Sequence, residues 1–232
     1  MLQAVCVYLL RCVFCPKASR RHARALWLQR TGRHVGRIFK LEVHVDGTIP
    51  ARGLLVSNHV SYVDIIALLS LATAMFVAKR EVKSWPVLGL MAQLGGTLFI
   101  DRQRRTHVGE INDDIQNALA DGALVIVFPE GTSSDGSTVL PFKSSLLEPA
   151  TQSKHPLTIG WVHYTLADGT ADVGVSYWGD DTFFPHLLNL LSKRSVRAVV
   201  RFAPIENHST DRKELAQQLH AAVLALKNES RP

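Results

Sequence analysis

The chain has 232 residues, of which 47% are hydrophobic and 20% are charged. These values exclude an intrinsically disordered protein and leave room for one large globular domain, or for two small ones at most. The formal net charge of +6 favours an anionic partner.

The positive charge is concentrated in residues 1–40. Nine of the 26 Lys and Arg residues lie there, and all 20 acidic residues follow it. The segment begins MLQAVCVYLLRCVFC, with apolar residues at helical spacing, but Arg11 interrupts a run that is already shorter than a membrane span. We predict a basic, amphipathic helical segment that lies on an anionic membrane surface. The alternative is a helix that packs on the domain's own core. No recognition motif accompanies the basic residues, so no nucleic-acid partner is predicted.

All three cysteines, Cys6, Cys12 and Cys15, lie in this same segment. Cys12 and Cys15 have the spacing of metal ligands, but no second pair completes a four-ligand site, so inert thiols and no metal site are predicted. An odd number of cysteines in one stretch does not indicate a disulfide framework, which favours a reducing compartment. The expected location is therefore peripheral, on the cytosolic face of the cell membrane.

From residue 41 onward, strand-like stretches alternate with helix-like ones. LEVHVDG alternates with period two and ends in Asp46-Gly47, a hairpin-type turn signal. GLLVSNH is a short apolar strand that leads into a buried helix, DIIALLSLA, and TAMFVAK and GTLFIDR are further strands. Apolar spacing then predicts an amphipathic helix that starts at Thr106 and stops before Gly122.

The second half continues the alternation. ALVIVF is a fully apolar strand, and LTIGWVHYT and ADVGVSYW flank the turn LADGT as an expected antiparallel pair. RAVVRFAPI is a last strand, and a C-terminal helix follows with Asp211 and Glu214 placed as a capping pair. The fold class is therefore α/β: residues 41–232 form a single domain with a mixed central sheet flanked by helices, preceded by the basic segment.

The stretch SNHVSYVD, residues 57 to 64, lies where a strand gives way to a helix, which is where α/β sheets usually hold their sites. Ser61 suits a helix N-cap, and Asp64 follows at nearly the position of a capping-box partner. His59 then precedes the helix, so its ring can fold back toward Asp64, which would hold one nitrogen and leave the other as a general base. The pattern is common, since His163 and Asp168 repeat it, and Asp64 as a simple helix cap is the alternative.

Two other sequence blocks also lie where an apolar strand ends. GGTLFIDR ends in Arg102, which suits a phosphate group, and FPEGTSSDG contains Gly131, which lets the backbone approach a ligand closely. The plain alternatives are that Pro129 and Gly131 only shape a turn, and that Arg102 pairs with Glu110 or another surface carboxylate.

In this order the blocks resemble the glycerolipid acyltransferase family, which includes the 1-acylglycerol-3-phosphate acyltransferases. The family pattern is NHxxxxD, then G-x-(I/L)-F-I-D-R, then F-P-E-G-T. Here Asn58-His59 with Asp64 fits the first, Gly96 to Arg102 the second, and Phe128 to Thr132 the third. AKREVKSWPVLG resembles a weaker intermediate block that contains Lys79. His163 and Asp168 are excluded by order, because they follow the third block.

The resemblance implies a membrane-associated enzyme that moves a fatty acyl group from acyl-CoA or acyl carrier protein directly to the free hydroxyl of a lysophospholipid. His59 would be the base, Asp64 would orient it, and Asn58 and Lys79 belong to the substrate-binding blocks. The head group would be bound by a set comprising Arg102, Glu130, Gly131 and Thr132, with Lys143 near the same mouth. Apart from the thioester co-substrate no cofactor is expected. Direct transfer agrees with the absence of a Gly-x-Ser-x-Gly elbow.

One departure affects the acceptor. Many family members have an arginine directly after E-G-T, whereas this chain has Ser133. Either Arg102, Lys79 or Lys143 compensates, or the acceptor is a lysolipid without a phosphate, such as lyso-ornithine lipid. FPEGTSSDG and YWGDDTFFPHL resemble that branch. A non-catalytic membrane-binding relative is a further alternative, which the intact His59 and Asp64 pair argues against.

Overall fold

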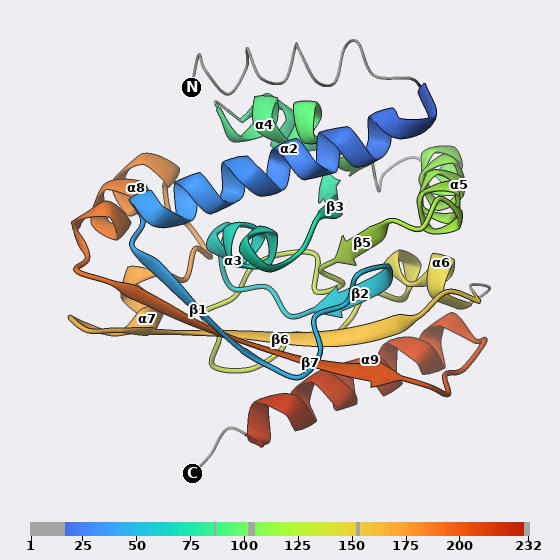
Figure 1. Ribbon diagram of the computed structural model, residues 1–232. Helices are drawn as coiled ribbons and strands as arrows, with labels where there is room; N and C mark the ends of the chain where they lie inside the picture. The colour runs from blue at the N-terminus through green and yellow to red at the C-terminus, as the bar shows by residue number, and fades with distance from the viewer. Residues whose placement is uncertain (1–16, 86, 102–104, 152–153, 230–232) are drawn as a thin grey trace.

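The computed structural model describes residues 17–85, 87–101, 105–151 and 154–229. Its centre is a seven-stranded mixed sheet with helices on both faces, in agreement with the α/β prediction (Figure 1). The strands are β1 (Leu41–Asp46), β2 (Gly53–Ser57), β3 (Ala74–Lys79), β4 (Leu98–Ile100), β5 (Leu124–Val127), β6 (Leu157–Leu166) and β7 (Val196–Ile205). The helices are α2 (Lys17–Ile38), α3 (Val63–Leu71), α4 (Leu88–Gly95), α5 (Arg105–Ala120), α6 (Glu148–Thr151), α7 (Ala171–Gly174), α8 (Phe183–Ser192) and α9 (Arg212–Asn228), with 3-10 turns η2 (Arg80–Ser84) and η3 (Ser144–Leu146).

The strands lie in the order β1-β7-β6-β2-β5-β3-β4. All neighbours are parallel except β6 and β7, which pair antiparallel along their whole length. Because β2, β5, β3 and β4 run in the same direction, the segments that follow them emerge at one edge of the sheet. The ends of the first and third sequence blocks lie at this edge, as does Asp101 of the second.

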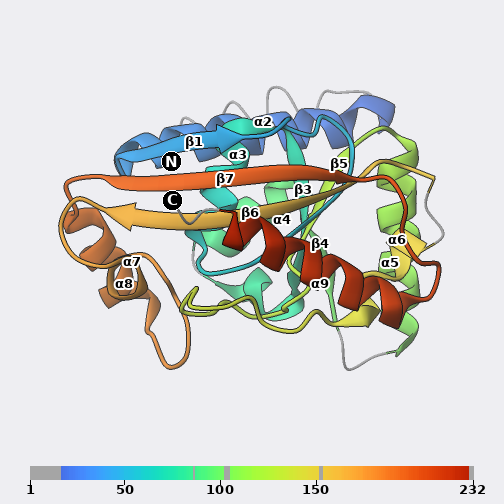
Figure 2. The same cartoon turned by 90° about the horizontal axis from the view of Figure 1, so that it is seen from below.

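Two apolar layers hold the helices to the sheet. Successive residues of a strand face opposite sides, so Leu55 and Ile126 pack in the layer beneath α2 and α3, while Leu54 and Val125 pack toward α5 and α9. Figure 2 shows α9 crossing the sheet below β6 and β7. Both faces of the central strands are therefore buried, which explains why the sequence of β2 and β5 is continuously apolar.

Helix α2 belongs to this core, although the sequence separated residues 1–40 from the domain that follows. Trp27 and Leu28 are each only 5% exposed and pack in the layer shared with α3. A Cβ added at Gly32 would lie 2.7 Å from the Cβ of Leu69, so the two helices cross closely. For residues 17–38 the structure therefore agrees with the alternative prediction, in which a basic helix packs on the core of the domain. The three cysteines lie outside the described residues.

No helix within the described ranges is both long and apolar enough for a membrane span. Helix α2 is long, but its sequence has basic residues along its length.

Two strand-pairing predictions are wrong. The Asp46-Gly47 turn does not join β1 to β2 in a hairpin, because β1 lies beside β7 on the far side of β6. Residues 171–178 do not form a strand: they contain α7 and irregular backbone. Both sides of β6 are already occupied, by β2 and β7, so no edge is free for the segment that follows it.

Candidate functional site

The candidate site lies at the carboxyl edge of the parallel strands. Val56 of β2 is in register with Val127 of β5, so the segments after both strands emerge side by side. His59 follows β2 by two residues, and Phe128 follows β5 directly. The structure therefore brings the first and third sequence blocks together, as their shared position at strand ends predicts.

His59 and Asp64 are in direct contact. Nδ1 of His59 lies 2.7 Å from Oδ2 of Asp64. The Asp64 side chain is fully buried and that of His59 is 20% exposed. A carboxylate accepts hydrogen bonds, so Nδ1 is the N–H donor, and in the neutral ring Nε2 carries the lone pair. The geometry is that of an oriented, partly accessible imidazole.

Asp64 also shapes the bend that makes this contact possible. Its Oδ2 accepts hydrogen bonds from the backbone N–H groups of Val60 (2.8 Å) and Ser61 (3.0 Å). In return, Val63 N–H donates to the hydroxyl of Ser61 at 3.3 Å. Helix α3 begins at Val63, two residues later than Ser61, with Tyr62 already in helical geometry. The carboxylate thus bonds both the ring of His59 and the backbone of the bend before α3, although the N-cap residue, Tyr62, has no side-chain cap bond.

Tyr164 is a further partner of Asp64 that the sequence did not reveal. Its hydroxyl donates to Oδ1 of Asp64 at 2.8 Å, so both carboxylate oxygens have donors. Burial, with the neighbouring Asp64 charge, raises the pKa of Tyr164 well above its ordinary value, which keeps the phenol protonated as a donor. Only the pairing of β6 with β2 places Tyr164 here, and no local pattern signals it.

The loop after β5 holds the backbone of His59 on both sides. Its N–H donates to Oε1 of Glu130 at 2.6 Å, and its carbonyl accepts from Ser134 N–H at 3.1 Å. The second oxygen of Glu130 accepts from Leu140 N–H at 2.8 Å. Glu130 is only 2% exposed, so in this structure its carboxylate supports the loop from behind rather than facing an expected head group.

Burial raises the pKa of Glu130 to about 7, with desolvation outweighing the opposing hydrogen bonds from Leu140 and His59. This carboxyl group therefore changes charge near neutrality while bonded to the backbone of His59.

Two further residues of this loop define the surroundings of the imidazole. The ring of Phe128 stacks on that of His59 with centroids 4.2 Å apart. Gly131 has a φ of +69°, which side-chain-bearing residues rarely adopt, and its N–H donates to the carbonyl of Phe128 at 3.0 Å. Thr132, the next residue, is exposed. The glycine therefore makes a tight turn that leaves Thr132 at the surface near His59.

The remaining predicted residues are placed as follows. Asn58 is buried and bridges to β6, donating to the carbonyl of Val162 at 3.0 Å and accepting from its N–H at 2.7 Å. Lys79 is exposed at the end of β3, on the same sheet edge as His59. Lys143 is exposed, and its N–H donates to the carbonyl of Pro129 at 2.8 Å. Arg102 lies outside the described residues.

The second His-x-x-x-x-Asp copy has no such geometry. His163 is exposed and stacks on Trp161 with centroids 5.2 Å apart. Asp168 accepts a hydrogen bond from Arg194 N–H at 3.4 Å. Residues 163 and 168 are thus engaged with different neighbours, which agrees with their exclusion by sequence order.

Ser133 connects the site to a second layer of aromatic residues. Its hydroxyl donates to the carbonyl of Tyr177, and Tyr177 N–H donates to the carbonyl of Val60 at 2.9 Å. The hydroxyl of Tyr62 lies 2.9 Å from Nδ1 of His186 on α8. These bonds tie residues 176–192 to the loop that carries His59.

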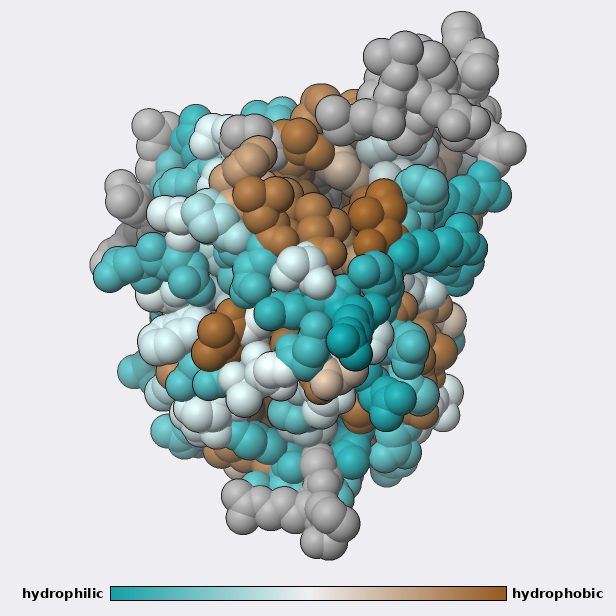
Figure 3. Space-filling view, turned by 90° about the vertical axis from the view of Figure 1, so that its left-hand side faces the viewer, coloured by the Kyte–Doolittle hydropathy of each residue, from teal (hydrophilic) through white to brown (hydrophobic). Residues whose placement is uncertain are grey.

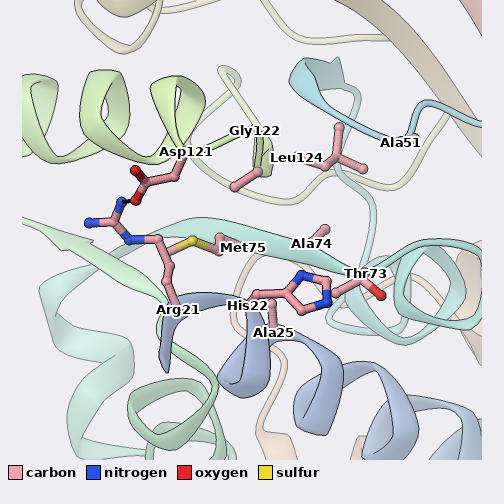
Figure 4. Close-up of a pocket in the computed structure, with 11 residues that line it drawn as sticks. Arg21, His22, Ala25, Ala51, Thr73, Ala74, Met75, Asp121, Gly122 and Leu124 are labelled. Carbon is pink, nitrogen blue, oxygen red and sulfur yellow. Dashed lines mark hydrogen bonds and ion pairs between the residues drawn. The ribbon is translucent and has the colours of Figure 1, made fainter. Parts of the chain in front are cut away.

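Two clefts lie at opposite edges of the sheet. One, of about 470 Å³, is lined by Val60, residues 135–137 and the end of β6, beside the candidate site. The other, of about 150 Å³, lies at the amino ends of β3 and β5, where Arg21 and Asp121 form an ion pair (Figure 4). Only the first is next to the His59 loop. Within the described ranges no cluster of His, Cys, Asp or Glu side chains has the composition of a metal site.

Known proteins that are similar to this chain are acyltransferases. Residues 40–165 match the family model described as Acyltransferase. The chain is 36% identical to a lyso-ornithine lipid O-acyltransferase of Rhizobium meliloti, over 82% of this chain and 71% of that protein. It is 32% identical to a 1-acyl-sn-glycerol-3-phosphate acyltransferase of Neisseria gonorrhoeae, over 91% of this chain and 83% of the relative. The crystal structure of the acyltransferase PlsC from Thermotoga maritima has the same fold, with a TM-score of 0.70 at 22% identity, over 97% of this chain and 88% of that one.

Proposed function

The chain belongs to the acyltransferase family, and from that premise we propose that it transfers a fatty acyl group from an acyl thioester to the free hydroxyl of a lysolipid. The observation that carries the proposal is the His59–Asp64 contact of 2.7 Å at the edge of the sheet. The donor is acyl-CoA or acyl carrier protein, and the acceptor comes from a membrane to which the protein binds peripherally, on its cytosolic face. Lysolipid-acylating relatives support this assignment.

In the proposed reaction His59 is the general base. Asp64 holds Nδ1, so Nε2 accepts the proton of the acceptor hydroxyl as its oxygen attacks the thioester carbonyl. A carbon–oxygen bond forms, the carbon–sulfur bond breaks, and the leaving thiolate takes the proton back from His59. Asp64 and the stacked ring of Phe128 keep the imidazole in one orientation throughout. A positioned base of this kind increases the reaction rate by about 10²–10⁴-fold.

Two head groups are candidates for the acceptor: the phosphate of lysophosphatidate and the zwitterionic head group of lyso-ornithine lipid. Ser133 favours the second. It takes the place of the arginine expected for a phosphate, and its hydroxyl is bonded to the Tyr177 carbonyl. A phosphate acceptor would instead rely on Lys79, Lys143 or Arg102, with Gly131 and Thr132 of the adjoining loop.

The base is tested by measuring thiol release from acyl-CoA with three variants. We expect His59→Ala to lower kcat by about 10²–10⁴ and to leave the fold intact, since this ring is partly exposed. Asp64→Asn should also lower kcat, because its amide cannot accept from all the same donors. His163→Ala is the matched control and should retain wild-type activity. Full activity of His59→Ala would contradict the proposal.

The acceptor is tested with lysophosphatidate and lyso-ornithine lipid side by side, each presented in the same vesicles with the same acyl-CoA panel. A higher kcat/KM for lyso-ornithine lipid is the expected result. Ser133→Arg should then move the ratio toward lysophosphatidate. Turnover of neither acceptor by wild-type protein, with acyl-CoA or with acyl carrier protein as donor, would favour a non-catalytic membrane-binding relative.

A further inference from the structure

An apolar surface covers α8 and the segment before it. We define the α8 surface as five large residues with exposed fractions of 37–71%: Val173, Trp178, Phe184, Leu188 and Leu191. Phe184, Leu188 and Leu191 follow helical spacing and lie on one face of α8, while His186 and Leu190 on the other face are buried. Figure 3 faces the side of the molecule where α7 and α8 lie and shows a large apolar patch in its upper half, with smaller apolar areas below it.

Helix α8 is apolar on both of its sides: Leu190 is buried, and Phe183 and Leu187 pack against the core. A surface helix of a water-soluble domain usually has a polar outer side, whereas the outer side of α8 exposes Phe184, Leu188 and Leu191. Single exposed apolar residues are normal, but a contiguous patch marks a contact with another apolar body. The α8 surface therefore needs a partner.

The α8 surface is fixed relative to the candidate site. His186 accepts from the Tyr62 hydroxyl at 2.9 Å, and its Nε2 lies 2.9 Å from the carbonyl of Ser176. The ring of Tyr62 also packs edge-to-face on those of Tyr177 and Phe183, at 5.5 and 5.4 Å between centroids. Tyr62 follows His59 by three residues, so whatever covers the α8 surface lies beside the site that receives the acceptor.

The residues around the patch suit a lipid bilayer. Trp178 combines an apolar ring with an N–H donor, the property that places tryptophan at membrane interfaces. At the carboxyl end of α8, Lys40 donates to the carbonyl of Lys193, and Arg194 is exposed beside it. Helix α2, which ends next to this corner, has basic residues and no acidic ones, and its last residue, Ile38, is 52% exposed. Cations bordering exposed apolar side chains match anionic headgroups above acyl chains.

We propose that the α8 surface enters a lipid bilayer and so brings His59 to the depth of a lysolipid hydroxyl. This rests on the proposed function, because that acceptor is itself a membrane component. Helix α8, which would then contact the vesicle, lies far in sequence from residues 1–16. A second copy of the chain is the competing occupant of this surface.

The test measures sedimentation of the full chain with vesicles of phosphatidylcholine and phosphatidylglycerol, without substrate. Phe184→Ser combined with Leu188→Ser should weaken binding by about tenfold or more. Val45→Ser with Ile49→Ser is the matched control, because those side chains are 38% and 39% exposed on another part of the surface. The control should bind like the wild type. Equal binding by both double variants would overturn the proposal.

Fluorescence gives a second measurement. Bromine-labelled phosphatidylcholine should quench Trp178, and the quenched component should disappear in Trp178→Phe. Trp27 and Trp161 are only 5% exposed, so they contribute little to such quenching. Trp85 is half-buried and lies against Phe183, so both proteins carry Trp85→Phe in this measurement. Absence of quenching would refute insertion. Dissociation of a dimer by the α8 variants, with vesicle binding unchanged, would assign the surface to a second copy and overturn the proposal.

The two proposals fail separately. If the wild-type chain transfers no acyl group, the proposed function is refuted. If the α8 variants nevertheless lose vesicle binding, the proposal for the α8 surface is supported. If both hold, the α8 variants should lose turnover of acceptors in vesicles and retain it on short-chain acceptors dispersed in detergent. Wild-type turnover of vesicle-borne acceptor by those variants would count against the α8 surface alone.

Discussion

At the scale of single residues, Asp64 receives hydrogen bonds from three kinds of donor. These are the His59 ring, the backbone N–H groups of Val60 and Ser61, and the hydroxyl of Tyr164. A buried carboxylate without such donors is costly, so each partner stabilises both the bend and the orientation of the imidazole. The proposed chemistry and the local fold consequently depend on the same side chain.

Tyr164→Phe tests this dependence. The variant keeps the ring and removes the donor to Oδ1 of Asp64, so the free energy of unfolding should fall by about 1–3 kcal/mol. We expect kcat to fall as well, by about tenfold, because Asp64 then holds His59 less rigidly. Urea denaturation and initial rates measure the two effects.

Tyr177→Phe is the matched control for Tyr164→Phe, since it removes a hydroxyl from the aromatic cluster around Tyr62 and not from Asp64. It should keep wild-type kcat in solution. Unchanged stability and rate in Tyr164→Phe would show that the phenol is dispensable to Asp64.

Glu130 makes stability depend on pH. Its folded-state pKa, raised to about 7 from 4.5, means that the folded protein binds this proton more tightly than the unfolded chain does. The resulting stabilisation is complete below pH 4.5 and is lost as the pH rises to 7, by about 3 kcal/mol. Urea unfolding between pH 4.5 and 8 should therefore show a decline that Glu130→Gln lacks. Parallel pH profiles for the two proteins would contradict this assignment.

At the scale of elements, the two ends of the chain show how local signals act. Asp211 caps α9, accepting from the N–H groups of Lys213 (2.8 Å) and Glu214 (3.0 Å), as the sequence predicts. The expected reciprocal bond is replaced, since Glu214 accepts from the hydroxyl of Ser209 at 2.8 Å. Helix α8, by contrast, buries Leu190 but also exposes Phe184 and Leu188 on its outer side, where local rules expect polar residues.

Asp211→Ala should lower the free energy of unfolding by about 1 kcal/mol, because two N–H groups of α9 lose their acceptor. Helix α9 packs on the face of the sheet opposite α3, so kcat should stay at the wild-type value. Denaturation curves and initial rates measure both quantities. Asp180→Ala, at another exposed aspartate, should change neither, and an equal loss in both variants would contradict the capping role.

At the scale of the whole molecule, the domain includes the basic helix α2. Trp27 and Leu28 complete the apolar layer over α3, so the fold extends toward the N-terminus beyond residue 41. The charge that marked this segment in the sequence lies on its outer face, where Arg30, Arg33 and Arg37 are exposed. Core packing and a basic surface therefore share one helix.

Trp27→Ala should lower the free energy of unfolding by about 3–5 kcal/mol, since it empties a buried ring site between α2 and the layer beneath. His22→Ala, an exposed position on the same helix, should change stability by no more than about 0.5 kcal/mol. Chemical denaturation measures both. A small effect of Trp27→Ala would show that α2 is not an integral part of the fold.

Much of the sheet and part of the site could be predicted from local patterns. Apolar alternation and runs located β1 to β7, because strand and helix periods depend only on neighbours in sequence. The contact of His59 with Asp64 followed from a bend that N-cap chemistry favours at Ser61. The support given by Glu130 and Tyr164 could not be predicted, since their partners lie 71 and 100 positions away.

Residue order alone was sufficient for the α/β class, for the three blocks and for the His59–Asp64 pair, because each depends on short-range geometry or on a shared pattern. Tertiary structure decided the rest: β1 lies beside β7, α2 packs in the core, Glu130 turns inward, and α8 exposes apolar residues on its outer side. The reason is physical. Which edge of a strand is free, and which side of a helix is covered, depends on chain segments that meet only after the sheet has formed.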